Sequence, residues 1–214
     1  MIPKTSKIWT LQTKSSIPSE LKAALKVDEI VLQYLVNRGI TQPAHAQSYL
    51  DFTRYTPTSP LDLPDMQKGI DRVQCAIQTS ELIGVWGDFD VDGQTATAVI
   101  VSALRKLNAR TEFYLPVRNT DSHGIALHAL KRFLDRGVKL LVTCDTGISA
   151  HESIDYAQTH GIDVIVTDHH QLASTLPPAY AVLNPQRVDP SHPLNVLAGV
   201  GTAYKFVEAL LSMN

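Results

Sequence analysis

Hydrophobic positions along the chain follow two different patterns, which change at about residue 80. From Pro18 onward, apolar residues recur every three to four positions, the spacing of a helix with one buried face, and Gly39 is placed where a helix would end. Two further helices are expected over residues 43–50 and about 66–79. We therefore predict a small helical region over residues 1–80.

Beyond residue 80, short apolar runs alternate with stretches of helical period. The runs are typical of buried strands and cover residues 82–86, 111–115, 139–144, 163–167 and about 181–183. The helical stretches between them cover residues 95–107, 125–134 and 149–160. This alternation predicts an α/β domain over residues 81–214, with helices on both faces of a mostly parallel sheet. Chemistry in such sheets gathers at the carboxyl ends of the strands.

Composition narrows the class of protein. With 214 residues, of which 44% are hydrophobic and 19% charged, the chain can bury a core, and no apolar run reaches the roughly 18–20 residues of a membrane span. The two cysteines, Cys75 and Cys144, are too few for a disulfide scaffold and too far apart for a zinc ribbon. No signal peptide is visible in the first residues, so we expect a cytoplasmic protein without a membrane partner.

The charge balance bears on possible partners. The chain has 19 basic and 21 acidic residues and a formal net charge of −2. It lacks the overall positive field of a nucleic-acid coat protein, so any polyanion would have to be bound locally.

The first predicted strand continues into a segment with three aspartates, Asp88, Asp90 and Asp92. Residues two apart in an extended segment face the same way, so the three carboxylates would point toward one place. Such charges repel and raise one another's pKa unless a cation neutralises them, which favours a divalent metal. A calcium loop of the EF-hand type is the alternative, but its twelfth position would be Val99 rather than Glu.

The strand over 139–144 ends at Asp145, which precedes a Gly and a Ser. A carboxylate at this place is a candidate metal ligand, and Ser149 at the start of the next helix is a candidate contact for a phosphate. An ordinary turn or capping residue is an equally good interpretation of Asp145 taken alone.

The strand over 163–167 ends in Asp168, His169 and His170. Two adjacent histidines at a strand end normally point to opposite sides. One would therefore bind the metal, and the other would support it or contact the substrate. Together with the aspartates at the same end of the sheet, these histidines make a metal site the preferred hypothesis.

The segment after the strand over 111–115 contains Arg118 and His123. An arginine beside a metal centre is a natural partner of phosphate oxygens, although a solvent-facing loop arginine is the alternative. Oxygen and imidazole ligands without thiolate favour manganese or magnesium over zinc.

In this order, these motifs resemble the DHH phosphoesterase superfamily and, within it, the RecJ-type single-strand-specific exonucleases. The motifs are Asp-x-Asp-x-Asp-Gly, Pro-x-Arg with a Gly turn, Cys-Asp-Thr-Gly-Ile-Ser, Asp-His-His, and the later Asn184-Pro185 and Leu197–Gly201 segments. The similarity covers about residues 20–214. It implies a parallel-sheet DHH-type domain preceded by helices.

The resemblance also implies a phosphodiesterase with two Mn²⁺ or Mg²⁺ ions, which would activate a shared water and hold the attacked phosphate. The residues implied as metal ligands are Asp88, Asp90, Asp92, Asp145 and His169. Those implied in catalysis are Asp145, His169 and His170, and those implied in phosphate contact are Arg118, His123, Ser149 and His170.

The implied substrate is single-stranded DNA, which the family digests from its 5′ end in recombination and repair. A single-strand-binding protein is a possible partner. Hydrolysis of short oligoribonucleotides or cyclic dinucleotides is the first alternative, and a non-catalytic DHH module is the second. Trp86 stands where the pyrophosphatases and oligonucleotide phosphodiesterases of the superfamily carry a histidine, which favours the exonuclease branch.

The family supplies another metal-binding aspartate from a Gly-Thr-x-Ala-Asp-type segment, followed by a second domain, and neither is found within residues 1–214. The chain is thus expected to be part of a longer enzyme or a naturally short homologue. We expect weak metal affinity and little processive exonuclease activity from it.

Overall fold

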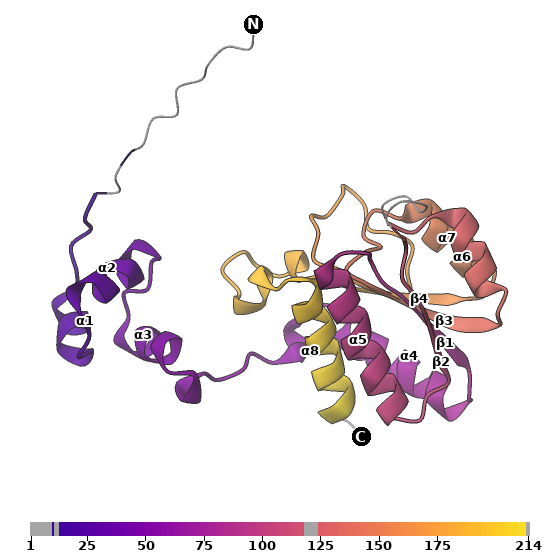
Figure 1. Cartoon of the computed structure of the whole chain (residues 1–214), viewed down its shortest axis with the longest axis horizontal. Coiled ribbons are helices and arrows are strands. Elements are labelled where there is room, and N and C mark those ends of the chain that lie inside the picture. The colour runs from indigo at the N-terminus through magenta and orange to yellow at the C-terminus, as the bar shows by residue number, and fades with distance from the viewer. Residues whose placement is uncertain (1–9, 11–12, 118–123, 213–214) are drawn as a thin grey trace, which may run out of the picture. The chain divides into compact units, whose positions relative to one another are not determined.

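The computed structural model describes residues 10, 13–117 and 124–212, and the chain divides into two compact units, 1–57 and 58–214. The first unit contains α1 (Ser19–Ala24), α2 (Glu29–Asn37), α3 (Pro43–Leu50) and the 3₁₀ turn η1 (Phe52–Arg54) (Figure 1). Its core consists of the buried residues Leu21, Leu25, Leu32, Leu35, Ile40 and Ala46. Gly39 follows α2 in the left-handed conformation, with φ of 75°, as the sequence predicts.

The second unit contains a five-stranded sheet. Its strands are β1 (Leu82–Trp86), β2 (Thr111–Tyr114), β3 (Val138–Cys144), β4 (Asp163–Thr167) and β5 (Ala181–Leu183). All neighbours pair in parallel, in the order β2-β1-β3-β4-β5, and the predicted parallel sheet is thereby confirmed. Its α-helices are α4 (Met66–Gln78), α5 (Val91–Lys106), α6 (Leu127–Leu134), α7 (His151–Thr159) and α8 (Gly199–Ser212). Four short 3₁₀ segments occur in the described residues, among which η2 (Pro60–Asp62), η3 (Pro185–Arg187) and η4 (Pro193–Val196) belong to this unit.

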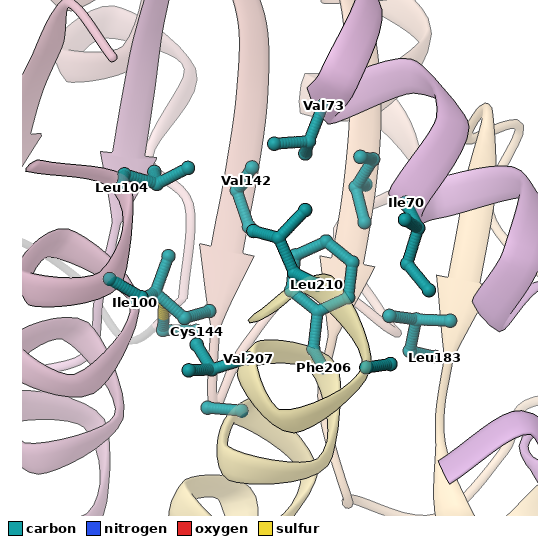
Figure 2. Close-up of a cluster of buried hydrophobic side chains, with 14 of the residues drawn as sticks. Ile70, Val73, Ile100, Leu104, Val142, Cys144, Leu183, Phe206, Val207 and Leu210 are labelled. Carbon is teal, nitrogen blue, oxygen red and sulfur yellow. The ribbon is translucent and has the colours of Figure 1, made fainter. Parts of the chain in front are cut away.

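Helices cover both faces of the sheet. On one face, α4, α5 and α8 pack against it, and Figure 2 shows side chains of these helices, such as Ile70, Ile100 and Phe206, in one cluster with Val142 of β3 and Leu183 of β5. On the other face, α6 and α7 enclose a second core that contains Phe133. Within the described residues, no helix is long and apolar enough to cross a membrane. The three layers explain why the central strands are apolar on both sides.

Helix α4 belongs to the sheet unit, whereas the sequence assigns residues 66–79 to the N-terminal helical region. Its buried residues, among them Ile70 and Val73, lie in the same core as the strands. Arg72 also forms ion pairs at the amino ends of β1 and β4. Its guanidinium nitrogens lie 2.7 Å from a carboxylate oxygen of Glu81 and 2.6 Å from one of Asp163. The compact unit that contains the sheet therefore begins at Thr58. A boundary at residue 80, as expected from the sequence, would separate α4 from the sheet that it covers.

Helix α5 begins at Val91, four residues before the start expected from its apolar stripe. Asp90 is its N-cap, and the Oδ1 atom of Asp90 accepts a hydrogen bond of 2.9 Å from the amide of Gly93. Because the first turn of α5 carries polar residues, hydrophobic period alone does not reveal it. The early start places Asp92 on a helix, which changes the geometry of the site.

Candidate metal centre

The acidic residues lie where the strand order of the sheet reverses. β1 is paired with β2 on one side and β3 on the other, so the chain leaves β1 and β3 toward opposite edges. Asp88 and Asp90 follow β1, Asp145 follows β3, and Asp168 follows β4. Parallel strands present their carboxyl ends at one edge, which is why residues far apart in the sequence meet there.

Asp145 is the central acidic residue of this edge. Only 1% of it is exposed, its φ is 60°, and among the described residues its Oδ1 atom accepts no hydrogen bond. Burial raises the pKa of Asp145 to about 7, and the charges of Asp92 and Asp90 contribute to the rise. A buried carboxylate oxygen without a donor fits a bound cation, which would satisfy it and restore the charged form.

Two imidazoles converge on Asp145. The Nε2 atom of His169 lies 3.1 Å from Oδ1 of Asp145 and 3.5 Å from Oδ2 of Asp92. Asp145, His169 and His170 can each offer one ligand atom, and these three atoms lie within 4.8 Å of one another. Oxygen and nitrogen donors without sulfur fit Mn²⁺ or Mg²⁺. The residues present therefore fit the expected ion.

The expectation that the two histidines point to opposite sides is wrong. Their ring centroids are 4.6 Å apart, and both lie near Asp145. Asp168 is the cause, because its Oδ1 atom accepts hydrogen bonds from the amides of His169 at 2.7 Å and His170 at 3.1 Å. This carboxylate turns the chain, so the alternation of an extended strand does not apply.

Asp168 also orients one imidazole. The Nδ1 atom of His170 lies 2.8 Å from Oδ1 of Asp168, and the other carboxylate oxygen accepts the amide of Ile148 at 2.9 Å. Partial burial lowers the pKa of His170, but the hydrogen bond to Asp168 and the charges of Asp168, Asp145 and Asp88 outweigh it, so the pKa is raised. Asp168 thus holds the two histidines in position and is not itself a candidate ligand of the same ion.

The three aspartates of the first motif do not project from one extended segment, and this expectation is wrong as well. Asp88 accepts the amide of Phe89, Asp90 caps α5, and Asp92 lies inside the first turn of α5. Strand β1 has already ended at Trp86, so the alternation of a strand does not reach them. Asp92 is beside His169, whereas Asp88 faces a neighbouring hollow.

That hollow has a volume of about 290 Å³ and lies beside the histidines. Its lining includes Asp88, Asp145, Ser149 and His170. Ser149 is exposed but does not cap the next helix, which begins at His151 after Ala150. The expected phosphate contacts Arg118 and His123 lie outside the described residues.

Three polar groups that donate hydrogen bonds to the site were not among the site residues expected from the sequence. The amides of Gly199 and Val200, at the start of α8, donate to Asp92, and the buried Asn184 donates from Nδ2 to the carbonyl of His170 at 3.0 Å. Asn184 directly follows β5, so its place after a strand was an available signal. Backbone donors carry no signal in side-chain type, so the contact of α8 with Asp92 was not predicted, although the Leu197–Gly201 segment was named among the motifs.

Residues 82–214 match the family model described as the DHH family, N-terminal domain. The chain belongs to the DHH family. The family resemblance and the fold expected from the motifs are thereby confirmed.

The curated DHH relatives include RecJ proteins. The chain is 36% identical over 191 residues to the single-stranded-DNA-specific exonuclease RecJ of Bacillus subtilis, an overlap of 89% of this chain and 24% of the relative. It is 40% identical over 149 residues to the RecJ of Escherichia coli, an overlap of 69% of this chain and 26% of the relative. The chain therefore spans about a quarter of the length of these relatives.

Solved DHH structures agree with the fold. RecJ from Thermus thermophilus in complex with Mn²⁺ superimposes with a TM-score of 0.74 at 28% identity, over 91% of this chain and 26% of that chain. Another exonuclease RecJ, bound to manganese, gives a TM-score of 0.67 at 29% identity, over 73% of this chain and 40% of that chain.

Proposed function

We propose that this DHH chain takes part in metal-dependent hydrolysis of phosphodiester bonds in single-stranded DNA, from the 5′ end. The observation that carries the proposal is the buried Oδ1 atom of Asp145, which accepts no hydrogen bond from the part of the chain that the structure describes and faces the Nε2 atom of His169. The relatives from Bacillus subtilis and Escherichia coli are single-stranded-DNA-specific exonucleases, which supports single-stranded DNA as the substrate. The Mn²⁺ in the similar RecJ structures supports the ion.

The proposed metal ligands are Asp90, Asp92, Asp145 and His169. Asp88, which lines the neighbouring hollow, is proposed as a further ligand. When bound, Mn²⁺ or Mg²⁺ would act as a Lewis acid toward the phosphate and lower the pKa of a water molecule. The chain itself fixes the donor atoms before any ion arrives, because amides hold Asp90 and Asp92 in place. Preorganised donors lose little freedom when they bind.

His170 is proposed to contact the phosphate. Its Nδ1 atom is held by Asp168, so Nε2 is the ring atom that remains for a substrate. Because the pKa of His170 is raised, the ring can hold a proton at Nε2 and donate it toward a phosphate or leaving oxygen. Ser149 lines the same hollow and is proposed as a further phosphate contact.

Trp86 supports the exonuclease branch over an oligoribonucleotide or cyclic-dinucleotide phosphodiesterase. It is wholly buried, and its ring stacks on Tyr114 with centroids 4.3 Å apart. This side chain belongs to the core and offers no ligand, whereas the other branch carries a histidine at this position. A cytoplasmic location and a single-strand-binding protein as partner belong to the same proposal, because both accompany a DNA substrate.

The test compares two substrates on the purified chain with Mn²⁺: a 5′-phosphorylated single-stranded DNA of about 30 nucleotides and a set of dinucleotides. We expect slow release of mononucleotides from the long strand, abolished by His169→Ala and by EDTA. His160→Ala, which changes an exposed histidine on the opposite end of α7, is the matched control. Faster cleavage of the dinucleotides would favour the other branch. No cleavage, with no Mn²⁺ bound, would favour a non-catalytic module.

A further inference from the structure

The start of α8 lies against two aspartates of the metal centre. The amide of Gly199 donates to Oδ2 of Asp92 at 2.8 Å, and the amide of Val200 donates to Oδ1 of Asp92 at 2.7 Å. Both oxygens of this carboxylate are therefore held by one helix turn, across 107 residues of sequence. Amide groups at a helix N-terminus carry partial positive charge, so α8 offsets negative charge in a cluster of acids.

The backbone at Gly199 leaves no room for a side chain beside the other aspartate, Asp145. A Cβ atom on Gly199 would lie 2.3 Å from Oδ1 and 2.6 Å from Cγ of Asp145. These distances are too short for any side chain at position 199. The nearest atom to it would be the buried Oδ1 of Asp145, the oxygen for which the described residues supply no hydrogen bond. Helix α8 approaches this closely only because residue 199 is glycine.

Asp145 has little freedom to move aside. It is 1% exposed, its backbone is in the left-handed region at φ of 60°, and its amide donates to the carbonyl of Thr167 at 2.8 Å. A side chain at position 199 would therefore displace the start of α8 and draw its amides away from Asp92. Helix α8 packs against α5, as Figure 1 shows. A shift of its first turn would therefore also shift the rest of the helix.

We propose that Gly199 is a positioning residue of the metal centre, and that the first turn of α8 couples binding of a divalent ion to the order of this helix. The inference rests on the proposed function, because it assumes that Asp92 and Asp145 bind the ion. It adds that α8, which carries none of the expected ligands, sets the distance between these two carboxylates.

The test measures Mn²⁺ affinity of the purified chain by isothermal titration calorimetry. We expect Gly199→Ala to weaken the affinity at least tenfold. Gly201→Ala is the matched control, because it changes a glycine in the same helix turn, and the three atoms nearest its Cβ would belong to the Leu197 side chain, at 3.1 Å or more. This control should bind Mn²⁺ within about twofold of the wild type. Urea unfolding in EDTA, run on both variants, separates a change in affinity from a loss of stability.

A second measurement needs no variant. Hydrogen exchange of the wild-type chain is followed by mass spectrometry with and without Mn²⁺. We expect the peptide that begins α8 to exchange at least threefold more slowly with Mn²⁺, while a peptide from α4 keeps its rate. This experiment decides the question even if Gly199→Ala does not fold.

The outcomes separate the inference from the function on which it rests. A wild type that binds no Mn²⁺ would overturn both. A wild type that binds Mn²⁺, together with a Gly199→Ala variant of equal affinity or an α8 peptide whose exchange ignores the ion, would overturn only the positioning role of Gly199. An equal loss of affinity in Gly201→Ala would also overturn it, because a methyl group that does not contact Asp145 would then have the same effect.

Discussion

The Nδ1 atom of His170 lies 2.8 Å from the Oδ1 atom of Asp168, a carboxylate that is 1% exposed. The same oxygen accepts the amides of His169 and His170, so one atom of Asp168 fixes both the turn and the ring. A hydrogen bond from an imidazole to a buried carboxylate fixes the tautomer and leaves the second ring nitrogen to the substrate. The proton on His170 therefore depends on Asp168.

Replacing Asp168 should change the titration of His170. Although burial lowers the pKa of His170, the bond and the charge of Asp168 raise it, so Asp168→Asn is expected to lower this pKa. NMR titration of the imidazole in EDTA measures the change, with the resonances of the exposed His160 as an internal reference. An unchanged pKa would mean that Asp168 does not control the proton.

Removal of the Asp145 charge should stabilise the metal-free chain at high pH. Because the pKa rises from 3.8 to about 7 in the folded chain, ionisation opposes folding. This cost appears as the pH rises above 3.8 and is complete above about 7. At about 1.4 kcal/mol per pKa unit, Asp145→Asn should gain up to about 4 kcal/mol at pH 8 and little near pH 4.

Urea unfolding in EDTA at both pH values measures this gain in the free energy of unfolding. Asp135→Asn, which removes an exposed charge at the end of α6, is the control and should change the free energy by less than about 0.5 kcal/mol. A variant that is less stable than the wild type at pH 8 would contradict the prediction.

Protons should compete with the ion for Asp145. With a pKa of about 7, this carboxylate is mostly protonated at pH 6 and mostly ionised at pH 8 in the metal-free chain. We expect the affinity for Mn²⁺ to increase about tenfold over this range, because the ligand must lose its proton to bind. Calorimetry in two buffers of different ionisation enthalpy also counts the released proton. A flat affinity profile would contradict the assignment of Asp145 as a ligand.

The ion pairs of Arg72 should contribute more to stability than an exposed pair. Arg72 is 13% exposed in its side chain and bridges Glu81 and Asp163, so Arg72→Met leaves two partly buried carboxylates unpaired. We expect a loss of about 1–3 kcal/mol in the free energy of unfolding. Arg136→Met, which breaks the exposed pair with Glu112, is the control and should cost less than about 1 kcal/mol. Equal losses of stability in Arg72→Met and Arg136→Met would contradict the prediction, because the partly buried and the exposed ion pairs would then contribute equally.

The hydroxyl of Thr143 should stabilise the loop after β3. Its Oγ1 atom donates to the carbonyl of Thr146 at 2.6 Å inside the fold. Thr143→Val keeps the shape and leaves that carbonyl without this donor, at a cost of about 1–3 kcal/mol. Thr159→Val, which removes an exposed hydroxyl from the end of α7, should cost less than about 0.5 kcal/mol in the same thermal or urea unfolding.

The sequence predicts the strands well because buried parallel strands are apolar on both faces. β1, β4 and β5 have the expected bounds, and α3 does as well. The residues at the carboxyl ends of β3 and β4, such as Asp145 and His169, could be placed together because parallel strands end at one edge. The topology of the sheet then determines the order of the strands and the edge at which these residues meet.

The rest depends on contacts that hydrophobic period does not carry. The first turn of α5 is polar, so its start at Val91 and the place of Asp92 were hidden. The turn at His169 and His170 depends on hydrogen bonds to one oxygen of Asp168. Helix α4 precedes the first strand, and only packing of Ile70 and its neighbours assigns it to the sheet.

The bond from α8 to Asp92 has a consequence for the order of folding. The last helix of the unit supplies the two donors for a carboxylate on the first helix after β1. A nascent chain that has emerged only as far as β5 already contains Asp88, Asp90, Asp92 and Asp145, but it lacks the amides that fix Asp92. We therefore expect the centre to gain its ion affinity only after Gly199 and Val200 have left the ribosome and α8 has packed against α5.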